Sequence, residues 1–209
     1  EVNMTSSKEK TLKMVQVAFM AALIVVLQLV STMTAGLLPV NITLTLMPIV
    51  IGGMLLGPLY GAALGIIFGI IVLVLCAAGM DVGGAILFQA NPLLCSLLCL
   101  VKGGAAGYFP ALLFHKTTNI TKKSNEHFFG ITMLGAAICP ILNTGIFCLG
   151  MVLFYKDILM AWAGGTNVIT YVLLGLTGIN FVIEFLINII LCPLVVRSLR
   201  NTRYFKHNV

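Results

Sequence analysis

Apolar residues fill long stretches of the chain, and polar residues are largely confined to the short segments between them. Stretches such as 15–30 and 179–196 are apolar on almost every face of a helix. They lack the alternation over about ten residues that marks the strands of a membrane β-barrel. Because a helix needs about 20 apolar residues to cross the hydrocarbon core, the pattern predicts an all-α integral membrane protein.

Turn residues and charges divide the chain into six predicted membrane-spanning helices. Gly57 and Pro58 form an uncharged tight turn, and the polar segment 115–127 separates two long apolar stretches. The predicted spans are 14–34, 43–56, 59–78, 88–114, 128–155 and 168–196. The second is too short to cross untilted, so it either begins earlier, in the outer loop, or meets a thinner bilayer. Residues 1–209 are predicted to form one transmembrane domain, a six-helix bundle.

The distribution of charge predicts which side of the membrane each connection faces. The chain has 12 Lys and Arg against 6 Asp and Glu, a formal net charge of +6, while 60% of its residues are hydrophobic. Nearly all the cations lie in three clusters, within 1–13, 115–127 and 197–209. Cytoplasmic segments carry an excess of Lys and Arg, and six spans place all three clusters on one side. Both termini and the 115–127 loop are therefore predicted to be cytoplasmic, and the basic balance needs no nucleic-acid partner.

Motifs for catalysis or nucleotide binding do not occur in the sequence. There is no Walker A loop, no HExxH and no GxSxG, so we predict no enzymatic activity and no cofactor in this chain. The six cysteines lie in or beside apolar stretches without CxxC or Cys/His spacing, and are predicted to be small buried hydrophobes that bind no metal. The N-terminal segment lacks a separate short apolar region with a cleavage site, so we expect no removable signal peptide.

Polar residues inside the predicted spans are the candidates for a substrate site, because such groups at membrane depth are costly and normally face a cavity or a partner. Asn180, Glu184 and Asn188 recur every fourth residue along one face of the last span. Lys102 is the other ionisable group well inside a span, and either pairs with Glu184 or meets a substrate carboxylate. The remaining candidates for substrate binding lie toward the outer side: Asn143, Gln89, Asn91, Asn41 and the interfacial aromatic Trp162.

Small residues spaced four apart predict close contacts between helices. Small side chains at this spacing let two backbones approach in lipid, where burial of apolar surface gains little. The glycines with this predicted role in helix packing are Gly53, Gly57, Gly61, Gly65 and Gly69. Ala18 and Ala22 form a shorter ridge of the same kind in the first span.

Two local sequences, together with the six-span plan, resemble the substrate-binding S components of energy-coupling factor (ECF) vitamin transporters. They are AFMAA at 18–22 and ITLTLMPIVIGGMLLGPLYGAALGIIFG at 42–69. The resemblance implies a multi-pass protein of a bacterial plasma membrane, with an outward-opening vitamin pocket lined by outer loops and the last three helices. It also implies two kinds of partner: a transmembrane coupling subunit, contacted by Ala18 and Ala22, and two ATPase subunits that use ATP.

The residues before Pro48 favour a pantothenate-type member. Riboflavin-type members usually carry an acidic residue there, whereas this chain has TLTLM at 43–47. Lys102 would also suit a carboxylate substrate such as pantothenate. Folate-type members bind carboxylates too, so folate and riboflavin stay as alternatives. A different class of function is a proton-coupled secondary carrier of a small organic acid, with Glu184 as the titrating group.

Overall fold

The structure is a computed structural model that describes residues 2–34, 44–120 and 125–200. These residues form helices joined by short turns, and they contain no strand. The predicted all-α class is therefore confirmed. In chain order the elements are α1 (Val2–Thr34), α2 (Leu46–Leu56), α3 (Pro58–Ala77), α4 (Val82–Ala90), α5 (Pro92–Ile120), α6 (Asn125–Phe154), α7 (Lys156–Ala163), α8 (Val168–Tyr171), the π-helical segment η1 (Val172–Thr177) and α9 (Gly178–Arg200).

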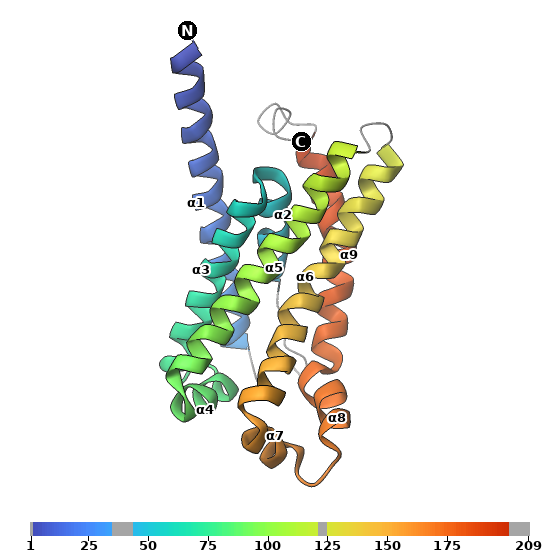
Figure 1. Ribbon diagram of the computed structural model, residues 1–209. Coiled ribbons are helices and arrows are strands. Elements are labelled where there is room, and N and C mark those ends of the chain that lie inside the picture. Colours follow the sequence, from blue (N-terminus) through green and yellow to red (C-terminus); the bar gives the residue numbers. More distant parts are fainter. Residues whose placement is uncertain (1, 35–43, 121–124, 201–209) are drawn as a thin grey trace.

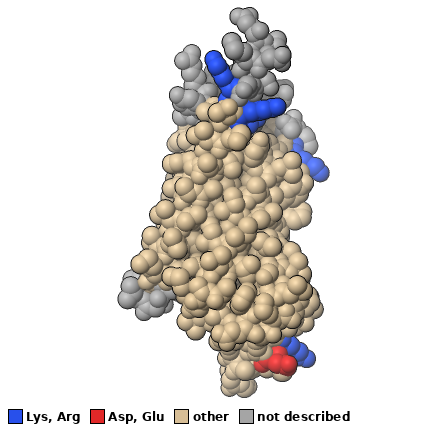
Figure 2. Space-filling model, turned by 90° about the vertical axis from the view of Figure 1, so that its left-hand side faces the viewer, with Lys and Arg blue, Asp and Glu red and all other residues tan. Residues whose placement is uncertain are grey.

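Five of the described helices contain segments that are long and apolar enough to cross a membrane. These segments are Lys10–Thr34, Pro58–Ala77, Pro92–Thr118, Phe128–Phe154 and Asn180–Leu199. A sixth candidate, Lys156–Ala163 with Val168–Leu176, is bent by 85° between its two halves. Figure 1 places the start of α1 and the end of α9 at one end of the bundle, and α4, α7 and α8 at the other. Figure 2 shows charged side chains near the two ends of one face and none across its middle. The chain is thus a multi-pass membrane protein, and the cytoplasmic location of its termini stays a prediction.

The second predicted span, 43–56, corresponds to the short helix α2. With 11 residues, of which all but Met47 are buried, α2 packs against α1, α3, α5, α6 and α9. It ends at Gly57, whose φ of 122° and N–H bond to the Gly53 carbonyl (3.0 Å) close the helix. Pro58 then begins α3 at once, as proline does readily in a first helical turn. Since α2 is enclosed by other helices, it belongs to the core of the bundle.

The structure corrects the boundaries of the fourth and sixth predicted spans. The fourth does not run unbroken from Phe88, because α4 ends at Ala90 and extended backbone at Asn91 precedes α5. The Asn91 side chain accepts a hydrogen bond from the Leu94 N–H (3.1 Å) and so caps the new helix. The span predicted for 168–196 is divided into α8, η1 and α9, with Gly178 at a φ of 50° where α9 begins.

The predicted loop at 115–127 is also shorter than expected, since α5 continues to Ile120 and α6 begins at Asn125. No glycine or proline interrupts this segment. The Thr117 hydroxyl donates to the Leu113 carbonyl at 2.8 Å, so this polar residue is accommodated within a helix. Polarity marked the end of the membrane span here, but it did not mark the end of the helix.

Helices α3 and α5 approach each other at backbone distance. A Cβ atom added at Gly61 or Gly65 would fall within 3.0 Å of the carbonyl oxygens of Gly107 and Gly103 respectively, and the reverse additions meet the same conflict. The four-residue spacing of glycines predicted only the α3 side of this contact; the GGAAG run at 103–107 supplies the other side. Gly53 meets Ala111 of α5 and Gly61, whereas Gly57 serves the turn between α2 and α3.

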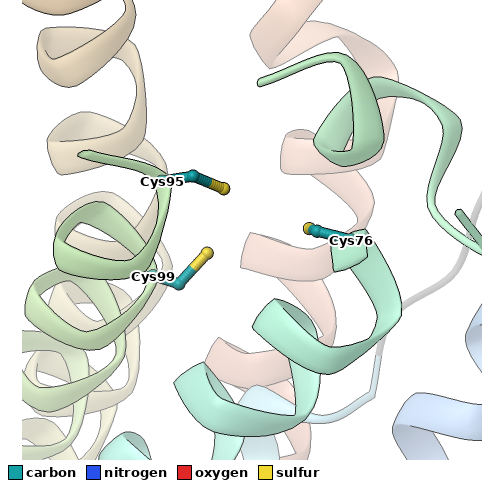
Figure 3. A group of neighbouring side chains, drawn as sticks. All are labelled: Cys76, Cys95 and Cys99. Carbon is teal, nitrogen blue, oxygen red and sulfur yellow. The ribbon is translucent and has the colours of Figure 1, made fainter. Parts of the chain in front are cut away.

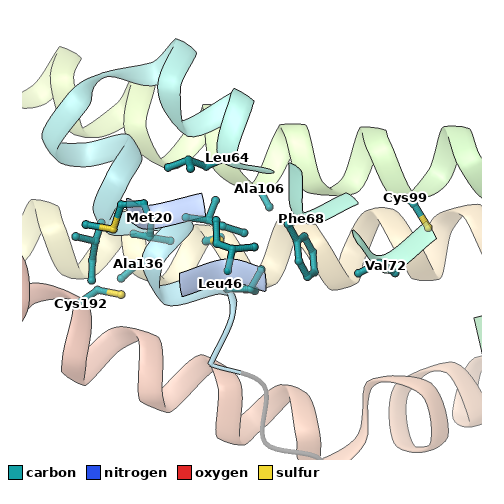
Figure 4. Close-up of a cluster of buried hydrophobic side chains, with 14 of the residues drawn as sticks. Met20, Leu46, Leu64, Phe68, Val72, Cys99, Ala106, Ala136 and Cys192 are labelled. Carbon is teal, nitrogen blue, oxygen red and sulfur yellow. The ribbon is translucent and has the colours of Figure 1, made fainter. Parts of the chain in front are cut away.

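The apolar core fills the space between the helices. Figure 4 shows buried side chains from different helices meeting, among them Met20 of α1, Leu46 of α2, Phe68 of α3, Ala106 of α5 and Cys192 of α9. Val72 and Cys99 lie at one end of this cluster, where they also line a cavity.

Candidate functional site

A cavity of about 190 Å³ lies among α3, α4, α5, α6, α7 and η1. Its walls include residues from α4 and α7, so it sits toward the end of the bundle opposite the start of α1 and the end of α9. It combines a cation, an acid, two aromatic rings and three thiols within otherwise apolar walls. This mixture of apolar surface with a few convergent polar groups is typical of a small-molecule site.

Lys102 of α5 supplies the positive charge of the cavity. Its Nζ atom lies 5.0 Å from the centre of the Phe147 ring on α6, a cation–π arrangement. Among the described residues, no carboxylate lies within ion-pair distance of this ammonium. An ammonium at membrane depth that has no such partner among the described residues is well placed to bind an anionic group.

The start of α4 and the helix α7 also contribute to the cavity wall. Asp81 caps α4, with its Oδ1 accepting a hydrogen bond from the Gly84 N–H at 3.0 Å. Gly84 lets α4 pack closely on α3, because a Cβ at this position would collide with the Cys76 sulfur and approach the Asp81 carboxylate. Trp162 of α7 also lines the cavity and is half-buried. The cavity lining therefore includes an acid and an indole side chain in addition to the ammonium.

Three thiols also line the cavity. Cys76 at the end of α3 and the Cys95 and Cys99 pair, one turn apart on α5, point toward one another (Figure 3). Their sulfur atoms all lie within 4.8 Å of one another, and all three residues are buried. This cluster was not predicted from the sequence, because its members come from two helices; the only local signal was the four-residue spacing of Cys95 and Cys99.

The polar line of α9 lies apart from the cavity. Glu184 and Asn188 are buried, whereas Asn180 is exposed. The Asn188 amide donates to the Glu184 carbonyl at 2.8 Å, and the Cys192 thiol donates to Asn188 Oδ1 at 3.5 Å. Helix α9 packs on α6 and α2 but does not contact α5. In the described part of the chain, Lys102 and Glu184 are therefore not paired with each other.

The remaining candidates are placed in different surroundings. Asn91 uses its side chain to cap α5, and its backbone carbonyl accepts a hydrogen bond from the Tyr155 hydroxyl at 3.1 Å. Gln89 is exposed on α4, and Asn143 is half-buried on α6 with a buried Oδ1 that has no partner among the described residues. Asn41 lies outside the described residues. Of the predicted substrate-binding residues, the structure brings Lys102 and Trp162 to the cavity, and adds Asp81, Phe147 and the thiols.

The small ridge of α1 faces away from the bundle. Ala18 and Ala22 are exposed, while Met20 and Ile24 on the other side of the helix are buried. Helix α1 contacts α2 and α3. The surface around Ala18 and Ala22 is thus available to lipid or to a partner protein.

A comparison with protein families agrees with this arrangement. The family model described as ECF transporter, substrate-specific component matches residues 12–196, from α1 to near the end of α9. No curated protein and no solved structure matches the chain. Because the family model matches far more than half of the sequence, the chain belongs to the family of ECF transporter substrate-specific components.

Proposed function

We propose that this chain is the vitamin-binding subunit of an ECF importer and that its substrate is a small organic carboxylate, with pantothenate favoured. The family assignment supports a substrate-specific, non-enzymatic role in transport. The observation that carries the choice of a carboxylate is the Lys102 ammonium in the cavity wall, which has an aromatic neighbour and no described carboxylate within ion-pair distance. A bound carboxylate would form a charge-assisted hydrogen bond with it.

The size and walls of the cavity support pantothenate over the larger vitamins. Binding sites for drug-sized ligands are commonly about 300 to 1,000 Å³, so a cavity of about 190 Å³ suits a compact substrate. Phe147 and Trp162 offer apolar contact for its methyl groups, and Asp81 offers an acceptor for its hydroxyl groups. Riboflavin has no carboxylate to satisfy Lys102, and folate adds a large ring system.

In the proposed transport cycle the substrate is captured at the end of the bundle that carries the cavity. The coupling subunit and two ATPases, which use ATP, then drive its release into the cytoplasm of a bacterium. Partners of these kinds are implied by the family. Uptake of radiolabelled pantothenate into liposomes tests the proposal: it should require the added partner subunits and ATP. Uptake driven by a pH gradient with this chain alone would identify a proton-coupled carrier instead.

The identity of the vitamin can be tested before reconstitution. Protein purified from cells should release pantothenate on denaturation, detected by mass spectrometry, because a high-affinity subunit retains its ligand. Titration of ligand-free protein should then show tight binding of pantothenate and much weaker binding of riboflavin and folate. Release of a different vitamin would overturn the assignment to pantothenate but leave the family unchanged.

A bulky residue in the small ridge of α1 should prevent assembly with the coupling subunit without affecting substrate binding. We predict that Ala18→Trp abolishes copurification with the coupling subunit, because the indole would hold the two helix surfaces apart where small residues allow contact. Ala18 is exposed and remote from the cavity, so pantothenate affinity should be unchanged. Val152→Trp, on the exposed face of α6, is the matched control and should assemble normally. Loss of both binding and assembly in Ala18→Trp would place the ridge in the internal packing.

A further inference from the structure

The three cysteine side chains in the cavity wall lie close enough together to bind one metal ion. Cys76, Cys95 and Cys99 are only 3%, 2% and 6% exposed, and their Sγ atoms lie within 4.8 Å of one another. Figure 3 shows all three side chains directed into the same space between α3 and α5. Thiolates are the preferred ligands of soft and borderline metal ions.

We propose that Cys76, Cys95 and Cys99 bind one zinc ion, with the fourth tetrahedral position directed to the cavity. Zinc–sulfur bonds of about 2.3 Å put tetrahedral sulfurs about 3.8 Å apart, so the sulfurs need to move only slightly inward from their present spacing. Zinc with three protein ligands and one open position is a common arrangement. Solvent or a group of the transported substrate can occupy the open position.

The backbone around the cluster is rigid enough to hold such a site. Gly69 of α3 packs against the backbone carbonyl of Cys99, where an added Cβ would leave no room. This contact fixes the distance between the two helices one to two turns from Cys76. Ligands held by packed helices bind a metal with little reorganisation. The two helices that carry the sulfurs, α3 and α5, are in direct backbone contact.

The charges in the cavity also suit a divalent ion. Binding breaks three S–H bonds, forms three Zn–S bonds and releases three protons to solvent, which gives the zinc–trithiolate unit a charge of −1. The Lys102 ammonium lies in the same cavity and offsets this charge while no substrate carboxylate is bound. Asp81 lines the cavity as well. Its carboxylate and the Cys76 sulfur both lie close to Gly84. The site goes beyond vitamin binding, because its ligands are thiols and not the groups proposed to hold the substrate.

Zinc titration of the reduced, chelator-treated full-length protein in detergent tests this inference. Competition with a chromophoric chelator should give one zinc ion per chain, and a pH indicator should record the release of protons. Cobalt in place of zinc should show a thiolate charge-transfer band. Loss of even an outer-sphere partner typically costs 10- to 100-fold in metal affinity, so Cys76→Ser and Cys99→Ser should each weaken binding roughly 100-fold or more.

Matched variants distinguish the cluster from the other cysteines. Cys148→Ser and Cys139→Ser, both on α6 and outside the cluster, should bind zinc like the unchanged protein. Zinc should also raise the melting temperature of the unchanged protein and of these controls but not of Cys76→Ser. If Cys76→Ser does not fold, Cys95→Ser serves in its place. Absence of zinc binding by the unchanged protein would overturn the proposal. Zinc binding by the Cys76, Cys95 and Cys99 variants equal to that of the unchanged protein would overturn it as well. Neither result would contradict the binding of a carboxylate by Lys102.

Discussion

Replacing Lys102 with methionine is expected to weaken pantothenate binding by about 2 to 5 kcal/mol, or roughly 30-fold to 5,000-fold in Kd. The substrate carboxylate would enter a cavity with apolar walls and lose the partner that replaces its hydration. Methionine keeps most of the side-chain volume, so packing against Phe147 should change little. The melting temperature without ligand should therefore stay close to that of the unchanged protein, while titration calorimetry records the loss of affinity.

Two controls make this prediction specific to the charge pair. Lys156→Met removes a cation from the exposed start of α7, at the same end of the molecule but outside the cavity lining, and should leave affinity unchanged. Pantothenol, in which a hydroxyl group replaces the carboxylate, should bind the unchanged protein weakly and should lose little further affinity in Lys102→Met. If Lys102→Met binds pantothenate as tightly as the unchanged protein does, the carboxylate lies elsewhere and Lys102 has only a structural role.

The helical architecture was predictable from the sequence because the bilayer imposes a simple length rule on apolar segments. That rule found α1, α3, α5, α6 and the body of α9. It failed at helix ends, where backbone chemistry decides: Asn91 with Pro92 restarts a helix inside the fourth span, and α5 continues through a polar segment in which the Thr117 hydroxyl bonds to the Leu113 carbonyl. Polarity along the chain reports the environment of a residue, whereas caps and breakers determine its backbone conformation.

Candidate site residues were harder to select because a polar residue in a membrane helix has two ways to be satisfied. Asn188 bonds to a carbonyl of its own helix one turn away, so its burial calls for no substrate. Lys102 has no comparable partner in the part of the chain that the structure describes, and it lies in the cavity wall. The sequence pattern cannot distinguish these two cases. The thiol cluster was out of reach for a related reason, since Cys76 meets Cys95 and Cys99 only through the packing of α3 on α5.

The glycine contact between α3 and α5 also positions residues of the cavity wall. Glycines at 61, 65, 103 and 107 bring α3 and α5 to backbone distance, and Gly69 continues the contact to Cys99 at the cavity wall. Because the helices touch through their backbones, no rotamer change can relieve an added side chain. The relative position of Cys76 and Lys102 in the wall depends on this contact, so its disruption should affect both stability and binding.

Gly65→Ala is expected to lower the free energy of unfolding by about 3 kcal/mol, the upper end of the usual cost of overpacking. The new methyl group would fall within 3.0 Å of both the oxygen and the carbon of the Gly103 carbonyl, so α3 and α5 must separate. Thermal melting in detergent should show the loss. Gly104→Ala, whose methyl group meets only the Ile66 side chain at 3.4 Å, and Gly145→Ala, which meets nothing within 4 Å, are the matched controls. Both should melt at or slightly above the temperature of the unchanged protein, since alanine is the better helix former. A Gly65→Ala variant that melts with these controls would show that α3 and α5 are not held together by their backbone contact.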